Sequence, residues 1–292
     1  MRGVLNVNKP SGITSYDVIR RLKPVLDTGR LGHAGTLDPL ATGVLLVLVN
    51  EATKTAEYLQ LQDKEYVAEV RLGIRTDTDD ISGKVQEEKP VVGITREQVS
   101  AVIARFVGEV EQVPPVFSAV KKEGERSYRL ARQGEVPVHA PRRVTVHELE
   151  LLEVNLPMLR LRAKVSRGTY IRALARDIGA ALGIGATLQS LIRTRIGAFS
   201  VQNAVELEAA DIAEHLIPVE QALAFLPFVT VADAAIPRLR TGRVLVEKDV
   251  VRGWSPDGFG PVVITDSERR VLFVGEYREG KLKPKRGIYA DA

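Results

Sequence analysis

Residues 32–43 combine one acid with residue types that build a stiff loop. The segment reads Gly32-His33-Ala34-Gly35-Thr36-Leu37-Asp38-Pro39-Leu40-Ala41-Thr42-Gly43. Glycines permit positive φ and close approach to a ligand, whereas Pro39 fixes its own φ and biases Asp38 toward extended backbone. A carboxylate held in this way can act as a base or as a covalent nucleophile at a sugar carbon. Asp-Pro is also ordinary turn chemistry, so the segment alone leaves a purely structural role open.

The chain lacks the residues and motifs that several other kinds of catalysis require. It has no cysteine, which excludes disulfides, thiolate catalysis and cysteine-ligated metals. There is no Gly-x-Ser-x-Gly elbow and no Walker loop, and the histidines at positions 33, 139, 147 and 215 lack helical metal-binding spacing. Three acids cluster within residues 75–83, but their spacing is not that of an EF-hand. We therefore expect a solvated loop there and regard Asp38 as the best candidate for catalysis.

Bulk properties predict an ordinary globular protein. The 292 residues are 45% hydrophobic and 27% charged, enough for a large domain with a smaller one. The net charge of +4 and the pI near 9.2 permit a polyanionic partner without requiring one. The longest apolar run, residues 44–49, is too short to span a bilayer, and the N-terminus lacks signal-peptide features. We expect a cytoplasmic protein that does not contact membranes.

The elements that must position Asp38 follow from hydrophobic periodicity, capping residues and turns. Short or alternating apolar runs predict strands at residues 3–8, 44–49, 64–72, 144–154, 158–166 and 196–201. Helical patterns predict helices at residues 15–25 (capped by Ser15), 51–61, 95–106, 173–182 and 205–226. After Pro227 the chain changes to short β-rich runs separated by Gly and Pro, with one short helix at 232–240. We therefore place a domain boundary there, between residues 1–227 and 228–292.

Residues 112–141 differ from the regular elements around them. Prolines bound a basic stretch that contains Lys121, Arg126 and Arg129, with aromatic residues between the charges. Basic and aromatic side chains together suit phosphate contact and base stacking. An ordinary charged surface loop is the alternative that the pattern leaves open.

The segment 32–43 closely resembles the signature loop of the tRNA pseudouridine synthase B (TruB) family. The resemblance continues, in the same order, through residues 9–12, 63–66, 75–79, 167–172 and 191–193. The tail from about residue 229 is similar to a PUA module, a small RNA-binding β-barrel. The likeness therefore covers nearly the whole chain.

The resemblance implies an α+β fold: a catalytic domain with a large mixed, mainly antiparallel sheet flanked by helices, and a small C-terminal PUA-like barrel. It implies an isomerase that flips uridine 55 out of the T loop of transfer RNA and converts it to pseudouridine. No redox step occurs, so no cofactor and no metal are expected. The transfer RNA T stem-loop would be the partner, with no guide RNA, no obligatory protein partner and a monomeric enzyme.

The resemblance also implies roles for individual residues. Asp38 would be the catalytic nucleophile or base, and Arg172 would pair with it and hold it ionised. Tyr66 would stack on the flipped uracil, Tyr170 would be the second aromatic contact, and Leu191 would pack in the pocket. His33 would fill the gap left by the flipped nucleotide. Supporting or RNA-contacting positions would be Lys9 and Arg193, together with Lys121, Arg126 and Arg129 in the 112–141 insertion that folds over the T arm.

Three other interpretations remain at this point. The first is the guide-RNA-dependent relative of this family, which shares the Asp loop and the PUA module. The second is an RNA-binding or RNA-folding protein in which catalysis is secondary. The third, a carboxylate hydrolase that uses Asp77 and Asp79, lacks an evident acid–base partner.

Overall fold

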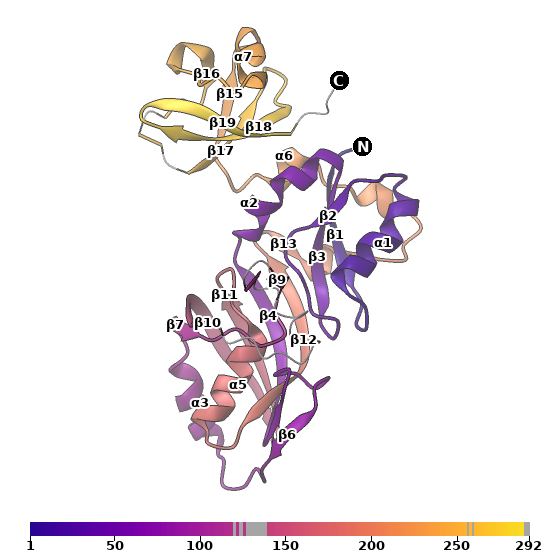
Figure 1. The fold of residues 1–292 in the computed structure, drawn as a ribbon, viewed down its shortest axis with the longest axis vertical. Helices are drawn as coiled ribbons and strands as arrows, with labels where there is room; N and C mark the ends of the chain where they lie inside the picture. Colours follow the sequence, from indigo (N-terminus) through magenta and orange to yellow (C-terminus); the bar gives the residue numbers. More distant parts are fainter. Residues whose placement is uncertain (119–120, 123–124, 127–138, 256, 259, 289–292) are drawn as a thin grey trace.

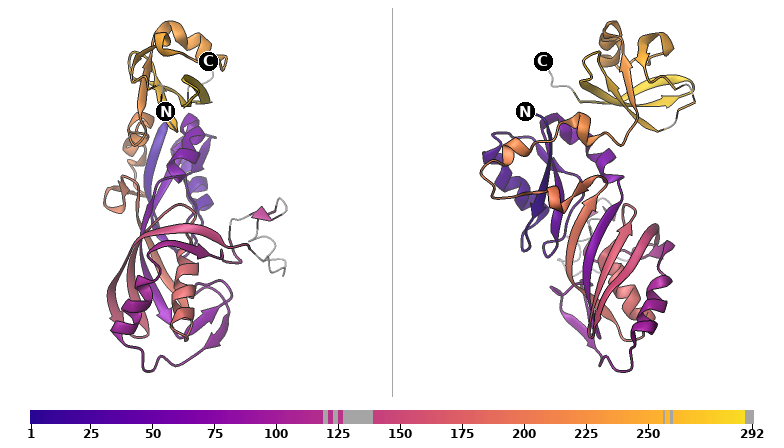
Figure 2. Two further views of the ribbon diagram at one scale, coloured as in Figure 1. Left: turned by 90° about the vertical axis from the view of Figure 1, so that its left-hand side faces the viewer. Right: turned by 180° about the vertical axis from the view of Figure 1, so that it is seen from behind.

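The computed structural model describes residues 1–118, 121–122, 125–126, 139–255, 257–258 and 260–288. The molecule is elongated and mixes α and β structure (Figure 1). A ten-stranded sheet runs through most of its length, and a five-stranded sheet lies at one end. Two further views place this C-terminal sheet at the end opposite helices α3 and α5 (Figure 2).

The large sheet is mixed and mainly antiparallel, with the order β14-β1-β3-β12-β4-β11-β10-β7, while β2 pairs with β3 and β13 pairs with β12. Its strands are β1 (Gly3–Lys9), β2 (Leu31–His33), β3 (Thr42–Val49), β4 (Lys64–Leu72), β7 (Gly108–Gln112), β10 (Arg142–Asn155), β11 (Met158–Val165), β12 (Ala186–Ile196), β13 (Phe199–Ser200) and β14 (Val205–Glu206). Two-stranded sheets are formed by β5 (Ile74–Thr76) with β6 (Val85–Glu88) and by β8 (Lys121–Lys122) with β9 (Glu125–Arg126). The main helices of this part are α1 (Ser15–Val25), α2 (Ala56–Gln60), α3 (Arg96–Ala104), α5 (Ile171–Ala181) and α6 (Val219–Ala222).

Strand β3 is apolar throughout because both of its faces are covered. Leu45 and Val47 pack in one buried cluster with α1, whereas Leu46 and Leu48 pack on the other face with α2. A strand covered on both sides reads as a continuous hydrophobic run. The expected buried strand is therefore confirmed, and the Asp38 loop leads directly into it.

Strand β4 alternates as its sequence predicts. Tyr66, Ala68 and Val70 lie in the buried cluster shared with α3 and α5, while Glu69 on the other face is exposed. Helix α3 begins with the expected capping box, in which the side chains of Thr95 and Gln98 each accept from the other residue's backbone N–H. The strand pair at β10 and β11 is confirmed as well.

Three local expectations are wrong. Thr14, not Ser15, caps α1. Residues 205–226 form short pieces instead of one helix, because Pro218 interrupts them and their apolar residues pack in two separate clusters. Residues 196–201 hold only the last residue of β12 and the two-residue β13, whereas the long strand lies earlier and begins at Ala186. Two irregularities in the pairing of β12 with β4 break the alternation that would reveal it.

The C-terminal sheet has the order β16-β15-β17-β18-β19. Its strands are β15 (Phe228–Val231), β16 (Val250–Arg252), β17 (Pro261–Thr265), β18 (Val271–Arg278) and β19 (Lys281–Gly287), with α7 (Ile236–Arg240) after β15. Among the described strands the edges β16 and β19 do not pair with each other, so the sheet is not the closed barrel expected. The Arg2 guanidinium donates to Ile288 O at 2.7 Å, and Arg286 lies 2.8 Å from Glu57, so polar contacts tie this sheet to the rest of the chain.

Candidate active site

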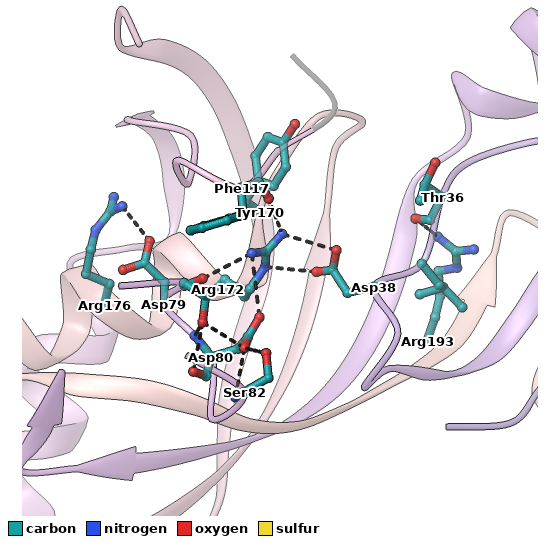
Figure 3. A network of polar contacts seen from close by, with 12 residues as sticks. Thr36, Asp38, Asp79, Asp80, Ser82, Phe117, Tyr170, Arg172, Arg176 and Arg193 are labelled. Carbon is teal, nitrogen blue, oxygen red and sulfur yellow. Dashed lines mark hydrogen bonds and ion pairs between the residues drawn. The ribbon is translucent and has the colours of Figure 1, made fainter. Parts of the chain in front are cut away.

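Asp38 lies on the loop before β3 and meets Arg172 side-on (Figure 3). Arg172 Nε lies 2.9 Å from Asp38 Oδ2, and Nη2 donates to Oδ1 at 3.1 Å. Arg172 comes from the first turn of α5, 134 residues further along the chain. The Arg172 side chain is only 5% exposed, whereas that of Asp38 is 33% exposed. The pair therefore presents its carboxylate, and not its cation, to an incoming ligand.

Arg172 is itself held from the side opposite Asp38 (Figure 3). Its Nη1 donates to Thr78 O at 3.0 Å and lies 3.6 Å from the buried carboxylate of Asp80. Asp80 Oδ1 in turn accepts from the Thr78 hydroxyl and from the Ser82 backbone N–H. The expectation that residues 75–83 form a solvated loop is therefore wrong, because this loop folds inward to supply the guanidinium with acceptors.

The Asp38 loop is fixed through its backbone. The buried Arg193 donates to Val44 O at 2.7 Å, to Gly35 O at 3.1 Å and to Thr36 O at 3.4 Å. Lys9, also fully buried, donates from Nζ to Pro39 O at 3.3 Å. These two cations therefore support the loop from within the protein. Both have a structural function that explains their presence without contact to an external ligand.

Two smaller features complete the hold on this loop. The Ser15 hydroxyl accepts from Leu37 N–H at 2.9 Å and donates to Leu37 O at 3.2 Å, which pins the residue before Asp38. Gly43 has φ +96°, and a Cβ there would lie 2.3 Å from Arg193 O. Only glycine fits this close approach between β3 and β12.

The other predicted site residues lie on elements that converge on the loop. Tyr66 and Leu191 are buried in the same apolar cluster as Leu37 and Ala41 of the loop. They belong to neighbouring strands, since Leu191 pairs with Ala68 of β4. The Asp38 loop therefore packs against the apolar cluster that contains these side chains.

Tyr170 and His33 are partly exposed, as Asp38 is. Tyr170 is the N-cap residue of α5, two positions before Arg172. His33 ends β2, directly before the loop, and pairs in register with Val47. His33 thus lies on the strand that leads into the Asp38 loop, and Tyr170 lies at the start of the helix that carries Arg172.

The pKa directions follow from burial opposed by charge. Burial raises the pKa of Asp38 above its ordinary value, and Asp80 adds to this rise, while Arg172 and Lys9 oppose it. Burial also raises the pKa of the Tyr170 phenol and lowers the pKa of the Lys9 ammonium to about 8. A raised pKa makes the ionised Asp38 carboxylate a stronger base than an exposed aspartate.

Of the three basic residues predicted to contact RNA in the 112–141 insertion, the structure describes two. Lys121 and Arg126 lie in the paired strands β8 and β9, whereas Arg129 lies outside the described residues.

Among the described residues, no group of three or more acidic or histidine side chains could hold a metal ion. In the same part of the chain, no helix is long and apolar enough to cross a membrane.

Asp80 and Ser15 are site residues whose function the sequence reasoning missed. The clustered acids at 77–80 were a visible signal for Asp80, but their partner Arg172 lies more than 90 residues away. Ser15 was interpreted as a helix cap, although the neighbouring Thr14 fills that position.

Comparison with known proteins decides between the possible functions of this site. Residues 23–171 match the model of the TruB family pseudouridylate synthase N-terminal domain, and residues 172–224 match that of the tRNA pseudouridylate synthase B C-terminal domain. The chain belongs to the TruB family. It is thus a tRNA pseudouridine synthase, an isomerase.

Individual TruB relatives agree over most of their length. A tRNA pseudouridine synthase B of Cupriavidus metallidurans is 41% identical over 98% of this chain and 94% of its own length. One from Azoarcus sp. is 42% identical over the same shares of the two chains.

Among solved structures, a Cbf5-Nop10-Gar1 complex contains a chain with a TM-score of 0.77 and 27% identity, over 98% of this chain and 85% of the other. A chain of an H/ACA RNP bound to a substrate RNA containing 2'-deoxyuridine gives a TM-score of 0.75 at 25% identity, over 99% and 85% of the two chains. The TruB fold of this chain is therefore shared with proteins of RNA-protein particles.

Proposed function

We propose that this TruB member isomerises uridine 55 in the T loop of transfer RNA, without a guide RNA or a protein partner. The observation that carries the proposal is the partly exposed Asp38 carboxylate, held side-on by the buried Arg172 on a loop that packs against an apolar cluster. Such a site offers one nucleophile to a base-sized ligand. The names of the bacterial relatives, all tRNA pseudouridine synthase B, support transfer RNA as the substrate class.

In the proposed reaction, Asp38 drives cleavage of the glycosidic bond between N1 and C1'. Its carboxylate attacks either the sugar or the base, and both routes free the uracil to turn within the site. A bond then forms between C5 and C1', the bond to Asp38 breaks and returns its electron pair to the carboxylate, the proton on C5 is lost, and N1 gains a proton. Atoms and electrons balance within the nucleotide, so the reaction consumes no oxidant or reductant.

The surrounding residues would recover the cost of flipping the base. Extracting a nucleotide costs a few kcal/mol, and stacking on Tyr66 would return roughly 1–3 kcal/mol. We assign Tyr170 as the second aromatic contact, near the C5 proton, and Leu191 as a wall of the pocket. His33 would occupy the space that the flipped nucleotide vacates.

The remaining chain would hold the transfer RNA. We propose that residues 1–227 form the catalytic domain and residues 228–292 a PUA-like RNA-binding module. The 112–141 insertion, with Lys121, Arg126 and Arg129, would contact the phosphates of the T arm. Lys9 and Arg193 would act as supports, since both are buried against loop carbonyls.

Incubation of the purified protein with a bare T stem-loop RNA, followed by nucleoside analysis, tests this proposal. We expect one pseudouridine per RNA, at the position equivalent to 55. A requirement for a guide RNA or an added protein would instead favour the particle-type relatives, whose solved structures share the fold. A replacement of the target uridine by cytidine provides the matched RNA control.

A further inference from the structure

One glutamine side chain holds both backbone polar groups of Tyr170. Gln112 is the last residue of β7, and its side chain is buried. Its Oε1 accepts from Tyr170 N–H at 2.7 Å, and its Nε2 donates to Tyr170 O at 3.1 Å. The two residues are 58 positions apart in the chain. A paired contact of this kind fixes both the position and the orientation of the peptide planes that it joins.

The held residue begins the helix that carries the cation of the site. Tyr170 is the N-cap of α5, yet its own side chain does not cap the helix. The N-cap backbone is extended, with φ −101° and ψ 112°, so local helical hydrogen bonds do not restrain its N–H. Gln112 supplies that restraint from another strand. The backbone from which the phenol projects is therefore held by a contact outside α5.

The segment after Gln112 continues along the same helix. Val113 O accepts from Arg176 at 2.9 Å, and Phe117 O accepts from Arg172 Nη2 at 2.9 Å. The start of the 112–141 insertion thus lies against the first turns of α5 through three contacts. Two of them use backbone carbonyls of this segment, and the third uses the Gln112 side chain. Gln112 is therefore the point where a substitution can loosen Tyr170 without altering the main chain.

We propose that Gln112 is a positioning residue that sets the placement of Tyr170 for the isomerisation step. This inference rests on the proposed contact of Tyr170 with the reacting uracil. Gln112 itself is buried and has its amide occupied by Tyr170, so it acts through that residue and not on the RNA. Loss of the amide lets the phenol shift, and a displacement of about 1 Å can cost roughly 100-fold in rate.

The test compares Gln112→Met with Gln112→Asn in single-turnover reactions on a T stem-loop RNA. Met keeps the length and removes both hydrogen bonds, whereas Asn keeps the amide but is one methylene too short to reach both groups. We expect both variants to lower the rate by about 10- to 100-fold and to leave the Kd for the RNA unchanged. Thermal unfolding confirms that each variant is folded under the assay conditions.

Gln98→Met is the matched control. The Gln98 side chain also accepts from a helix N-cap, Thr95 N–H at 2.9 Å, but α3 carries no residue of the site. We expect this variant to lose stability and keep the wild-type rate. An equal loss of rate in Gln98→Met would mean that general destabilisation explains both results, and would overturn the proposal.

Tyr170→Ala separates the positioning role from the role of Tyr170. We expect Tyr170→Ala to be slow and the double variant with Gln112→Met to be no slower, because Gln112 then has no phenol to place. If Tyr170→Ala is slow but both Gln112 variants react at the wild-type rate, the positioning role alone is wrong. If Tyr170→Ala keeps the wild-type rate, the proposed contact with uracil is wrong and the positioning role falls with it.

Discussion

Arg172 faces Asp38 with two nitrogens, Nε at 2.9 Å from Oδ2 and Nη2 at 3.1 Å from Oδ1, while its own side chain is buried. The same guanidinium donates to Thr78 O and Phe117 O, so three segments meet at one cation. This geometry favours the ionised carboxylate against the opposing effect of burial.

Arg172→Lys should shift the pH dependence of the reaction. The ionised Asp38 is the active form, so the rate falls as the pH drops through its pKa, which burial already raises. Lysine cannot reproduce the side-on contact. We therefore expect the acid limb of the pH–rate profile, the range in which the rate falls at low pH, to move to higher pH. We also expect the rate on the plateau above this range to fall by about 100-fold. RNA affinity should change little, because Arg172 is buried. Single-turnover rates across the acid range and RNA Kd values measure both effects, with Arg176→Lys on the same helix as the control.

Asp80→Asn should move the acid limb the other way. The negative charge of Asp80 raises the pKa of Asp38, so its removal lets Asp38 ionise at lower pH. The plateau rate should nevertheless fall by roughly 10-fold, because Arg172 loses an ion-pair partner and is held less precisely. Asp77→Asn is the matched control, since Asp77 accepts from Lys84 N–H instead. A shift of the Asp80→Asn limb to higher pH would contradict this electrostatic account.

Arg193→Met should lower the stability of the protein more than its affinity for RNA. The variant removes the donor from three carbonyls, of which the contact to Val44 O is buried and those to Gly35 O and Thr36 O are partly buried. A buried acceptor left unsatisfied costs about 1–3 kcal/mol, so we expect the free energy of unfolding to fall by about that amount, as measured by urea titration. Arg195→Met, the same change at an exposed position two residues along β12, should leave stability nearly unchanged. Weaker RNA binding by Arg193→Met at wild-type stability would assign Arg193 to RNA contact instead.

Lys64 should make the protein more stable as the pH rises through the alkaline range. Burial lowers its pKa from 10.5 to about 8, so between these values the unfolded chain binds more protons than the native state. The free energy of unfolding therefore gains on the order of 2–3 kcal/mol from this residue as the pH rises across that window. Lys64→Met should lose this gain, whereas Lys23→Met, at an exposed position, should keep it. Parallel pH profiles for the wild type and Lys64→Met would refute the prediction.

Several elements of the catalytic domain could be predicted because their signals are local. The apolar run of β3, the alternation of β4 and the capping box of α3 each depend on neighbouring residues, and each is confirmed. Most of strand β12 was not predicted, because its pairing irregularities and the buried Arg193 disturb the alternation. Residues 205–226 were misread because packing against two clusters, and not helical propensity, decides their path.

In the site, too, local features could be predicted from the sequence and long-range contacts could not. The acid and its likeness to the TruB loop could be found from the sequence, since both depend on consecutive residues. The inward fold of residues 75–83 could not, because it depends on Arg172, which lies more than 90 residues later. The amide contact of Gln112 with Tyr170 likewise joins two residues that no local pattern connects.

The most direct test of the central claim is Asp38→Asn, assayed for pseudouridine formation and for binding of the T stem-loop. Asparagine keeps the size of the side chain but removes the charge that the nucleophile needs. We predict an unchanged Kd and no pseudouridine, even when the enzyme exceeds the RNA. Pseudouridine formation by Asp38→Asn near the wild-type rate would contradict the assignment of Asp38 as the residue that carries the reaction.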